Sequence, residues 1–329
     1  MKKCLLLVLA LLFGGVIFAN DTYFFTSGGN IFCAEDKDIS VQMESEVIAL
    51  TLQPDYYEVT VDFNFYNTGK TVELLVGFPF FEAGIGGHGK IYDFKCWTNG
   101  ELTDFSDQPI IMEFSNTNFN GEELQNAYTR KVVFPAKKVT KTKVYYKSEY
   151  GQDTEGVIVK YLYGTGSSWK DDIGEITLII ENNLPYSRPV GFELPENGTS
   201  FVRLEDNKWQ TKFYNVAPEY TDCITINARN ILDDTGPRAF PSYGYTFSQK
   251  KAQPEWLFWY TKPQLRILRN TIYALHGYSF KSQDLKELFT SWGKYWHPAY
   301  KENPDFSENE LSEIEKYNAK LLLEEENRR

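Results

Sequence analysis

The segment Tyr57-Glu-Val-Thr-Val-Asp-Phe-Asn-Phe65 alternates apolar and polar residues without a break. Tyr, Val and Phe occupy its odd positions, while Glu, Thr, Asp and Asn occupy its even positions. Strict period-two alternation is typical of a β-strand that buries one face and exposes the other to water. Asn67-Thr-Gly69 follows almost directly and predicts a hairpin turn into the next strand.

Further strand patterns fill the region from residue 38 to about residue 228. The segments are short and are separated by Gly, Asn and Asp: 39–52, 110–115, 129–135, 139–149, 156–163, 174–181, 200–205, 209–214 and 222–227. Many short strands with such turn residues favour an antiparallel sandwich, and no segment here has a convincing helical period. The sequence therefore predicts an N-terminal all-β antiparallel sandwich domain over residues 20–228.

The pattern changes after residue 228. Residues 229–254 are rich in Gly, Pro and polar side chains, which predicts a linker. From Thr261 onward the apolar residues recur with a helical period, and Gly277 is placed to end this first helix. The fold class predicted from these two halves is a two-domain chain, with a small three-helix α domain over residues 255–329.

Capping signals place the starts of the three helices. Thr261 and Gln264 have the spacing of a capping box at the first start. Ser282 precedes a second helical pattern over 283–291. A third helix is predicted to start at Ser307, because Glu310 completes a second Ser-x-x-Glu box.

The first residues indicate the compartment. Two lysines precede an apolar run from Leu5 to Phe18, which is too short to span a bilayer comfortably. We predict a signal peptide over residues 1–19, cleaved after Ala19. Cys4 lies before the apolar run, so no lipobox is evident. A secreted or periplasmic protein without a transmembrane helix after cleavage is expected.

Charge and cysteine content exclude some functions. The formal net charge of −11 would repel a phosphate backbone, so nucleic acid is not an expected partner. Cys33, Cys96 and Cys223 would remain after cleavage, which allows at most one internal disulfide and leaves its pairing open. Their spacing does not make a zinc site, and we predict neither a metal nor a cofactor.

The helical region carries a family resemblance. "LRILRNTIYALHGYSFKSQDLKELF" (265–289) and "FSENELSEIEKYNAKLL" (306–322) resemble the YARHG domain of secreted bacterial proteins, over about residues 255–325. The name-giving motif corresponds to Tyr273-Ala-Leu-His-Gly277, and it has arginine where this chain has Leu275.

The first half is similar to an uncharacterised family of secreted bacterial β-domains. Three features carry this resemblance: Gly28-Gly29, "VGFPF" (76–80) and "YLYGTGSSWKDDIGEITLII" (161–180). Both resemblances imply location and architecture rather than a mechanism.

His276 has two possible roles. As a general base it would need partners, and Asp284 and Ser282 are the nearest candidates in sequence. No strained Gly-x-Ser-x-Gly turn surrounds this serine. A histidine in the last turn of a helix instead donates to the final carbonyl groups and meets the negative end of the helix dipole. We therefore interpret the motif residues Tyr273, His276 and Gly277 as structural.

The best candidate for a binding surface is an aromatic segment in the helical region. It contains Trp292, Tyr295, Trp296, His297 and Tyr300. Exposed Trp and Tyr rings would form a platform for sugar rings. The alternative is that these rings fill the core of a small domain that is short of aliphatic side chains.

Three other motifs lead to no site. "YGTGSSWK" (163–170) lacks the glycine spacing of a phosphate loop and is followed by aspartates and a strand. Residues 305–316 lack the glycine and the final glutamate of a calcium loop. His88 stands alone on a Gly-rich loop.

Together these observations favour a secreted or periplasmic, non-catalytic protein that binds an envelope component, either a glycan or another protein. No complete catalytic set is present in the sequence. The alternative is an envelope hydrolase, acting on cell wall or glycan, that uses His276 or His297 with acidic partners.

Overall fold

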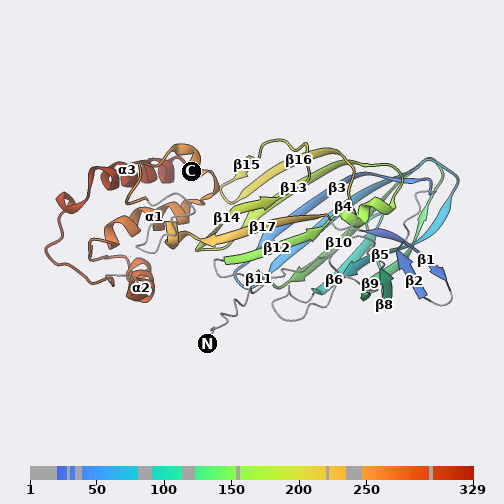
Figure 1. The fold of residues 1–329 in the computed structure, drawn as a ribbon, viewed down its shortest axis with the longest axis horizontal. Helices are drawn as coiled ribbons and strands as arrows, with labels where there is room; N and C mark the ends of the chain where they lie inside the picture. Colours follow the sequence, from blue (N-terminus) through green and yellow to red (C-terminus); the bar gives the residue numbers. More distant parts are fainter. Residues whose placement is uncertain are drawn as a thin grey trace, which may run out of the picture.

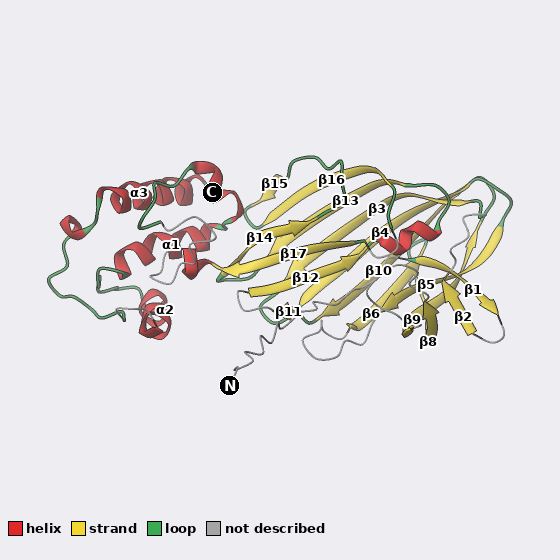
Figure 2. Ribbon diagram, in the orientation of Figure 1, coloured by secondary structure: helices red, strands yellow, loops and turns green. Residues whose placement is uncertain are grey.

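The computed structural model describes residues 21–27, 30–33, 39–80, 91–112, 123–152, 156–219, 222–234, 247–295 and 299–329. Strands dominate the part before residue 231 and helices the part after residue 253 (Figure 2). The helical part lies at one end of an elongated molecule (Figure 1). The predicted fold class, a β-rich N-terminal part followed by a small three-helix part, is confirmed.

Among the described residues the strands form three sheets. The large sheet has the order β15 (Val202–Glu205), β16 (Lys208–Val216), β13 (Ile173–Asn182), β3 (Val41–Leu52), β4 (Tyr57–Asn67), β10 (Val139–Ser148), β6 (Ile91–Thr98), β7 (Glu101–Thr103). The small sheet has the order β11 (Gly151–Gln152), β12 (Gly156–Leu162), β17 (Cys223–Asn230), β14 (Ser187–Glu193). The closed sheet has the order β1 (Thr22–Ser27), β2 (Asn30–Cys33), β8 (Ser106–Met112), β9 (Glu123–Phe134), β5 (Val72–Phe80), and it closes because β1 also pairs with β5.

Strand β4 has the two faces that its sequence predicts. Its odd positions from Tyr57 to Phe65 are all buried, whereas the side chains between them are half-buried or exposed. The large sheet is nevertheless mixed rather than purely antiparallel, because β13 runs parallel to β3. A parallel neighbour requires a long connection, and most of the β-rich part lies between these two strands in sequence.

The turn at Asn67–Gly69 does not make the predicted hairpin. Strand β4 pairs with β3 and β10, whereas β5 pairs with β9 and β1, so the turn passes the chain from the large sheet to the closed sheet. The buried Asn67 side chain organises this crossing. It accepts hydrogen bonds from Ser40 Oγ (2.7 Å) and Gly69 N (2.8 Å) and donates to Phe134 O (2.8 Å). The contacts with Ser40 and Phe134 join distant parts of the chain and could not be predicted from the local pattern.

One hydrophobic core is shared by the three sheets, and it encloses a group of polar side chains. Arg130 on β9 pairs with Asp21 at 2.6 Å, and neither side chain is more than 1% exposed. Thr142 on β10 donates to the same carboxylate at 2.8 Å, and Trp169 Nε1 donates to Asp21 O at 2.8 Å. Buried charges persist when they are paired and hydrogen-bonded, as these are.

A second buried acid lies in the same core. Glu46 on β3 accepts a hydrogen bond from the Tyr161 hydroxyl on β12 at 2.5 Å. Burial raises the pKa of Glu46 to about 8, and the negative charge of Asp21 adds to this effect. The carboxyl group is therefore largely neutral at pH 7.

Cys96 and Cys223, the cysteines whose side chains the structure describes, are not part of a disulfide. Each of the three possible pairings of the predicted cysteines requires at least one of these two residues, so none of the pairings forms. Burial raises the pKa of Cys223 to about 12 and also raises that of Cys96, so both thiols stay protonated near neutral pH.

The helical part has its own core. Its helices are η4 (Pro254–Trp259), α1 (Lys262–Ala274), α2 (Gln283–Trp292), η5 (Gly293–Tyr295), η6 (Glu308–Glu310) and α3 (Glu313–Arg328). Ile231, Leu232 and Phe247, which fall in the segment predicted as a linker, are buried in this core. None of the described helices is both long enough and apolar enough to cross a membrane.

The predicted starts of the first two helices are confirmed, whereas the third is wrong. Thr261 is the N-cap of α1 and Ser282 that of α2. Ser307 does form a capping box with Glu310, but this box closes only the short helix η6. Leu311 is extended, and a second box between Ser312 and Glu315 then begins α3. A capping box marks a position where a helix can start. The helix that starts at the first box ends after one turn, because Leu311 packs into the core in an extended conformation.

Hydrogen bonds from β15 and its turn join the β-rich part to the helical part. Arg203 donates to the carbonyl oxygens of Phe258 and Tyr260, the latter at 3.1 Å. The Asp206 carboxylate accepts from Lys262 N at 2.8 Å and so caps the first turn of α1 from outside the helix. The Trp259 ring packs among aromatic rings of the β-rich part.

The C-terminal residue takes part in this junction. Arg329 donates to Leu257 O at 2.8 Å and pairs with Glu325 at 2.7 Å, and only 7% of its side chain is exposed. Acidic and basic ends of helices are often frayed, but here the carbonyl groups of η4 hold the end of the chain.

Candidate functional site

His276 joins the end of α1 to the start of α3. Its Nε2 lies 2.9 Å from Glu315 Oε1, and the Glu315 side chain is only 8% exposed. The other carboxylate oxygen accepts from Ser312 N at 2.8 Å, which closes the capping box of α3. One carboxylate thus caps a helix and contacts His276, and this arrangement supports the structural interpretation of the motif.

Gly277 turns the chain where two segments meet. Its φ of +80° lies in the left-handed region, and its carbonyl oxygen accepts from Asn303 N at 2.7 Å. A Cβ at this position would lie 2.6 Å from Lys301 O and 2.9 Å from Asn303 Cβ. Both the backbone conformation and the close approach therefore require glycine.

Tyr273 completes the motif with ring contacts. It packs edge-on against Tyr278 and Phe306, and it borders a hollow of about 330 Å³ between α1 and α3. Arg269, which also borders this hollow, is paired with Glu326 at 3.0 Å.

Ser282 and Asp284 form a separate cluster that does not include His276. Both hydrogen-bond to Arg266, whose Nη1 lies 2.6 Å from Asp284 Oδ2. The hydrogen bonds from Arg266 and Ser282 hold the pKa of Asp284 well below its usual range. The structure therefore does not bring together the serine, histidine and aspartate that a hydrolase of this kind would need.

The predicted aromatic segment is only partly described. Trp292 is 41% exposed, and its ring lies 6.4 Å from that of Tyr186, which belongs to the β-rich part. Tyr300 is half-buried, donates to Tyr278 O at 2.9 Å and packs near Phe289. Trp296, His297 and the side chain of Tyr295 lie outside the described residues, and so does His88.

A site that the sequence analysis missed lies on the open face of the large sheet. Strand β10 points Thr142 and its other even positions into the core, and this leaves Lys141, Lys143, Tyr145 and Lys147 on the opposite face. The pairing register sets Lys143 between Trp97 on β6 and Asp62 on β4. Alternation along each strand, together with the register, thus gathers aromatic and charged side chains from three strands.

A tight hairpin between β6 and β7 lies beside Lys141 on this face. Asn99 and Gly100 connect β6 to β7, and both have positive φ, as a type I′ turn requires. Asn99 exchanges hydrogen bonds with the Lys141 backbone: its N donates to Lys141 O at 2.7 Å, and its Oδ1 accepts from Lys141 N at 3.0 Å. The Asn-Gly dipeptide is the sequence signal that could have predicted this hairpin.

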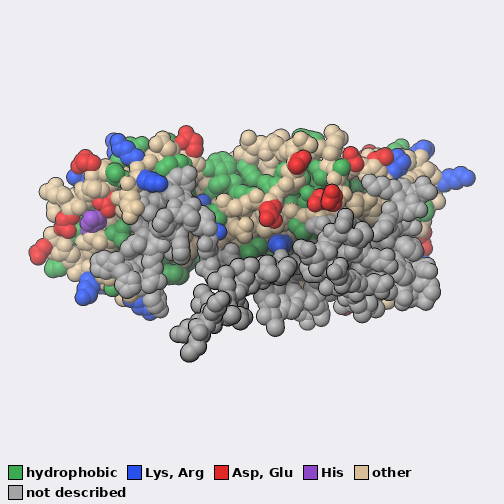
Figure 3. Space-filling model, viewed as in Figure 1, with side chains coloured by type: hydrophobic (Ala, Val, Ile, Leu, Met, Phe, Trp, Pro, Cys, Tyr) green, Lys and Arg blue, Asp and Glu red, His purple; other side chains and the backbone are tan. Residues whose placement is uncertain are grey.

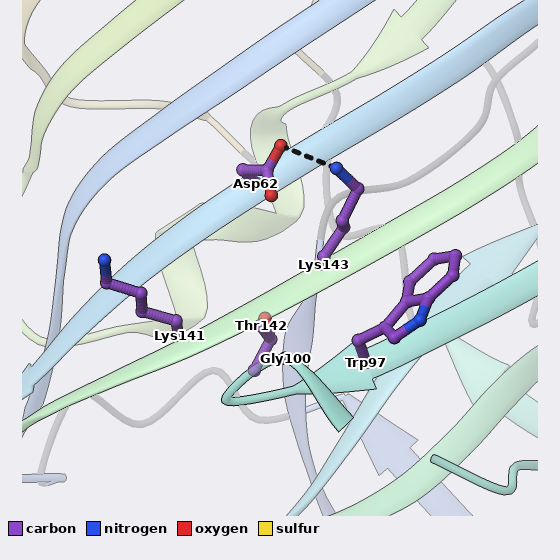
Figure 4. Close-up of a pocket in the computed structure, with 6 residues that line it drawn as sticks. All are labelled: Asp62, Trp97, Gly100, Lys141, Thr142 and Lys143. Carbon is purple, nitrogen blue, oxygen red and sulfur yellow. Dashed lines mark hydrogen bonds and ion pairs between the residues drawn. The ribbon is translucent and has the colours of Figure 1, made fainter. Parts of the chain in front are cut away.

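Residues of β4, β6, β10 and the hairpin surround a shallow hollow of about 420 Å³, which we call the Trp97 hollow (Figure 4). It is lined by Asp62, Trp97, Gly100, Lys141, Thr142 and Lys143. The Lys143 ammonium pairs with the Asp62 carboxylate at 3.2 Å, and Lys141 and Trp97 lie on either side of this pair (Figure 4).

The chemistry available in the Trp97 hollow is that of binding. It offers a ring face, two ammonium groups and a carboxylate, but no histidine or cysteine. Across the described part of the chain, no cluster of three or more His, Cys, Asp and Glu side chains could hold a metal ion.

Surface chemistry elsewhere is mixed. Figure 3 shows hydrophobic side chains near the middle of the molecule, where the helical and β-rich parts meet, and charged side chains of both signs around them. The edge strand β15 contributes two exposed apolar residues, Val202 (52%) and Leu204 (48%).

Comparisons with known proteins agree with this architecture. A family model for the YARHG domain matches residues 242–327, which confirms the resemblance of the C-terminal part. The match begins inside the segment predicted as a linker, where Phe247 already belongs to the helical core. A search of curated proteins returns no match to the chain.

The chain shares its fold with a solved structure from Legionella pneumophila, described as a "putative nutrient binding protein". The two are 21% identical, the TM-score is 0.50, and the match covers 93% of this chain and 97% of that one. An M1 zinc metallopeptidase from Deinococcus radiodurans matches far more weakly, with a TM-score of 0.31 and 7% identity over 58% of this chain and 43% of that one. This second likeness is too weak to indicate a shared fold.

Proposed function

We propose that this chain, which carries a YARHG domain, is a secreted or periplasmic, non-catalytic protein that binds a component of the cell envelope. The Trp97 hollow on the open face of the large sheet is the proposed binding site. The observation that carries the proposal is that the half-buried Trp97 ring and the exposed Lys141 side chain lie there without side-chain partners among the described residues. Side chains that the fold does not use are available to a ligand.

Several features support an extracytoplasmic binding role. The N-terminal residues have the pattern of a cleavable signal, and the YARHG domain occurs in extracytoplasmic proteins. The Legionella pneumophila protein of similar fold is described as nutrient-binding, which agrees with a binding role but names no ligand for this chain.

The aromatic segment over residues 292–300 is proposed as a second contact surface. Its support is the exposed Trp292 ring beside the junction of the two parts. The alternative of a hydrolase based on His276 receives no such support, because the Glu315 carboxylate that contacts His276 also caps α3.

Co-sedimentation tests the proposal. The full-length mature protein is incubated with washed cell envelopes, and the bound fraction is measured for the wild type, Trp97→Ala and Trp292→Ala. We expect the wild type to sediment with envelopes and Trp97→Ala to lose most of this binding. Loss in Trp292→Ala alone would move the site to the helical part. Absence of sedimentation of the wild type would overturn the proposal.

A further inference from the structure

We infer that the Trp97 hollow takes an acidic sugar chain, with one ring stacked on the indole and a carboxylate or phosphate group of a neighbouring ring held by Lys141. This inference deepens the proposed function and rests on it. It depends on three observations: an indole without a hydrogen bond or ring contact among the described residues, a lysine without an ion pair among them, and the Lys143–Asp62 pair between the two.

The Trp97 ring differs from the two buried indoles in its surroundings. The buried Trp169 and Trp209 donate hydrogen bonds from their indoles and pack against other rings. Trp97, in contrast, is half-buried and makes no hydrogen bond or ring contact within the described residues. Its cross-strand neighbour Leu102 is 69% exposed, so the ring stands at an open, apolar edge of the sheet. A flat apolar surface with a free N–H donor suits the face of a sugar ring.

Lys141 is the cation that remains available. Lys143 is already paired with Asp62, whereas Lys141 is exposed and forms no ion pair with any described residue. The two lysines are two residues apart on one strand, which is about 7 Å. Trp97 is the cross-strand neighbour of Lys143, so the Lys141 ammonium group and the indole are also separated by at least this distance. A ligand that contacts both must therefore extend over more than one sugar ring, which a single small ion does not.

The charges around the hollow limit the kind of anion. Asp62 is exposed in the hollow and would repel an anionic group placed next to it, while its oxygens can accept hydrogen bonds from sugar hydroxyls. The whole chain carries a net charge of −11. The acid groups of a dense polyanion that lie too far from Lys141 to pair with it would therefore be repelled by the protein surface. A chain with separated acid groups and many hydroxyls fits this pattern better than a polyphosphate or an acidic peptide.

A matched pair of oligosaccharides tests the inference. Titration calorimetry on the full-length protein would compare a hexamer in which glucuronic acid alternates with N-acetylglucosamine, so that its acid groups are separated, with a neutral hexamer of N-acetylglucosamine. We expect the acidic hexamer to bind at least ~5-fold more tightly, since one charge contact of about 1 kcal/mol corresponds to roughly this ratio. The binding should weaken as salt is raised, because the contact is exposed.

Two variants and a control locate the contact. Lys141→Gln should remove the preference for the acidic hexamer, and Trp97→Ala should abolish binding of both hexamers. Lys131→Gln changes a lysine on the closed sheet whose side chain is 74% exposed, and it should leave the affinity within about twofold. Thermal melts of each variant would show that the fold is intact.

The outcomes separate this inference from the proposed function. Equal binding of the two hexamers, or an unchanged preference in Lys141→Gln, overturns the inference that the ligand is acidic and contacts Lys141. Binding of poly-glutamate as tight as that of the acidic hexamer also overturns it, since the indole would then have no role. If envelopes sediment the protein through Trp97 while neither hexamer binds, the inference fails and the proposed function stands. If envelopes do not bind the protein at all, both fail.

Discussion

Each side of the large sheet faces a cation–carboxylate pair, and the two pairs differ in burial, in distance and in the strands that supply them. On the core side, Arg130 meets Asp21 at 2.6 Å, and at most 1% of either side chain is exposed. On the open side, Lys143 meets Asp62 at 3.2 Å, with 40% and 53% of the side chains exposed. Strand β10 contributes to both environments, through Thr142 inside and Lys143 outside.

The difference shows which side chains the fold uses. Removing one partner from a buried pair leaves an unpaired charge in a medium that cannot solvate it, whereas water replaces the lost partner of an exposed pair. The buried pair on the core side is therefore expected to be required for the stability of the fold. Substitutions on the open side are expected to leave the fold intact, so the side chains there are available for binding.

Breaking the buried Arg130–Asp21 pair should have the largest effect on the free energy of unfolding. Arg130→Met leaves the Asp21 carboxylate buried and unpaired, and we expect the free energy of unfolding to fall by about 3–5 kcal/mol. Chemical denaturation monitored by tryptophan fluorescence measures this loss. The matched change Lys143→Met on the outer pair should cost at most about 1 kcal/mol. Similar losses in the two variants would contradict the division of the sheet into a structural and an available side.

The neutral acid of the core predicts a pH dependence. Because the folded pKa of Glu46 is raised from its ordinary value of 4.5 to about 8, the folded state retains a proton that the unfolded state releases. Its stabilising contribution is therefore fully present below about pH 4.5 and is lost as the pH rises toward 8.

Glu46→Gln isolates this contribution. The amide can still accept the Tyr161 hydrogen bond but does not titrate, so the variant should lose less stability than the wild type between pH 5 and pH 8. We expect the difference to be on the order of 3 kcal/mol, at about 1.4 kcal/mol per pKa unit. Thermal melts at the two pH values check it, and parallel pH profiles for the two proteins would refute it.

Gly277 extends the comparison to the helical part. Gly277→Ala forces a side chain into the left-handed region and against Lys301 O, and we expect a loss of about 1–3 kcal/mol in denaturant unfolding. Gly100→Ala is the control, because Gly100 also has positive φ (+88°) but no atom lies within 4 Å of the added Cβ. A smaller loss at position 277 than at position 100 would mean that the crowding does not matter.

The open side should show the smallest effect on stability. Lys141→Gln removes an exposed charge without an ion-pair partner among the described residues, and the free energy of unfolding should change by less than about 0.5 kcal/mol. The same denaturation experiment measures it. A loss above about 1 kcal/mol would show that Lys141 supports the sheet and is not free for a ligand.

Sequence reasoning predicted the elements far better than the site. Strands with strict alternation, such as β4, and helices with capping boxes, such as α1, are encoded by residues close together in the chain. The Trp97 hollow was missed because its residues come from three strands that are neighbours only in space. Lys141 and Lys143 read as ordinary solvent-facing positions until the register places Trp97 beside them.

His276 shows how a rare residue type draws attention in a sequence. His276 is one of three histidines and stands in a recognisable motif, yet its contacts are with the end of one helix and the start of another. The start of α3 was placed at Ser307 for a similar reason, because two capping boxes follow one another and local signals cannot rank them.

By itself the sequence determined the β-rich and helical halves, the pattern of a secretory signal, the acidic surface and the resemblance to the YARHG domain. These properties depend on composition, on local periodicity and on contiguous motifs. Only the tertiary structure decided that Asn67–Gly69 joins two sheets, that Asp21 pairs with Arg130 in the core, and that an indole and a lysine on the open face have no side-chain partners among the described residues. The physical reason is that burial and strand register are set by contacts between distant residues, and no single segment contains them.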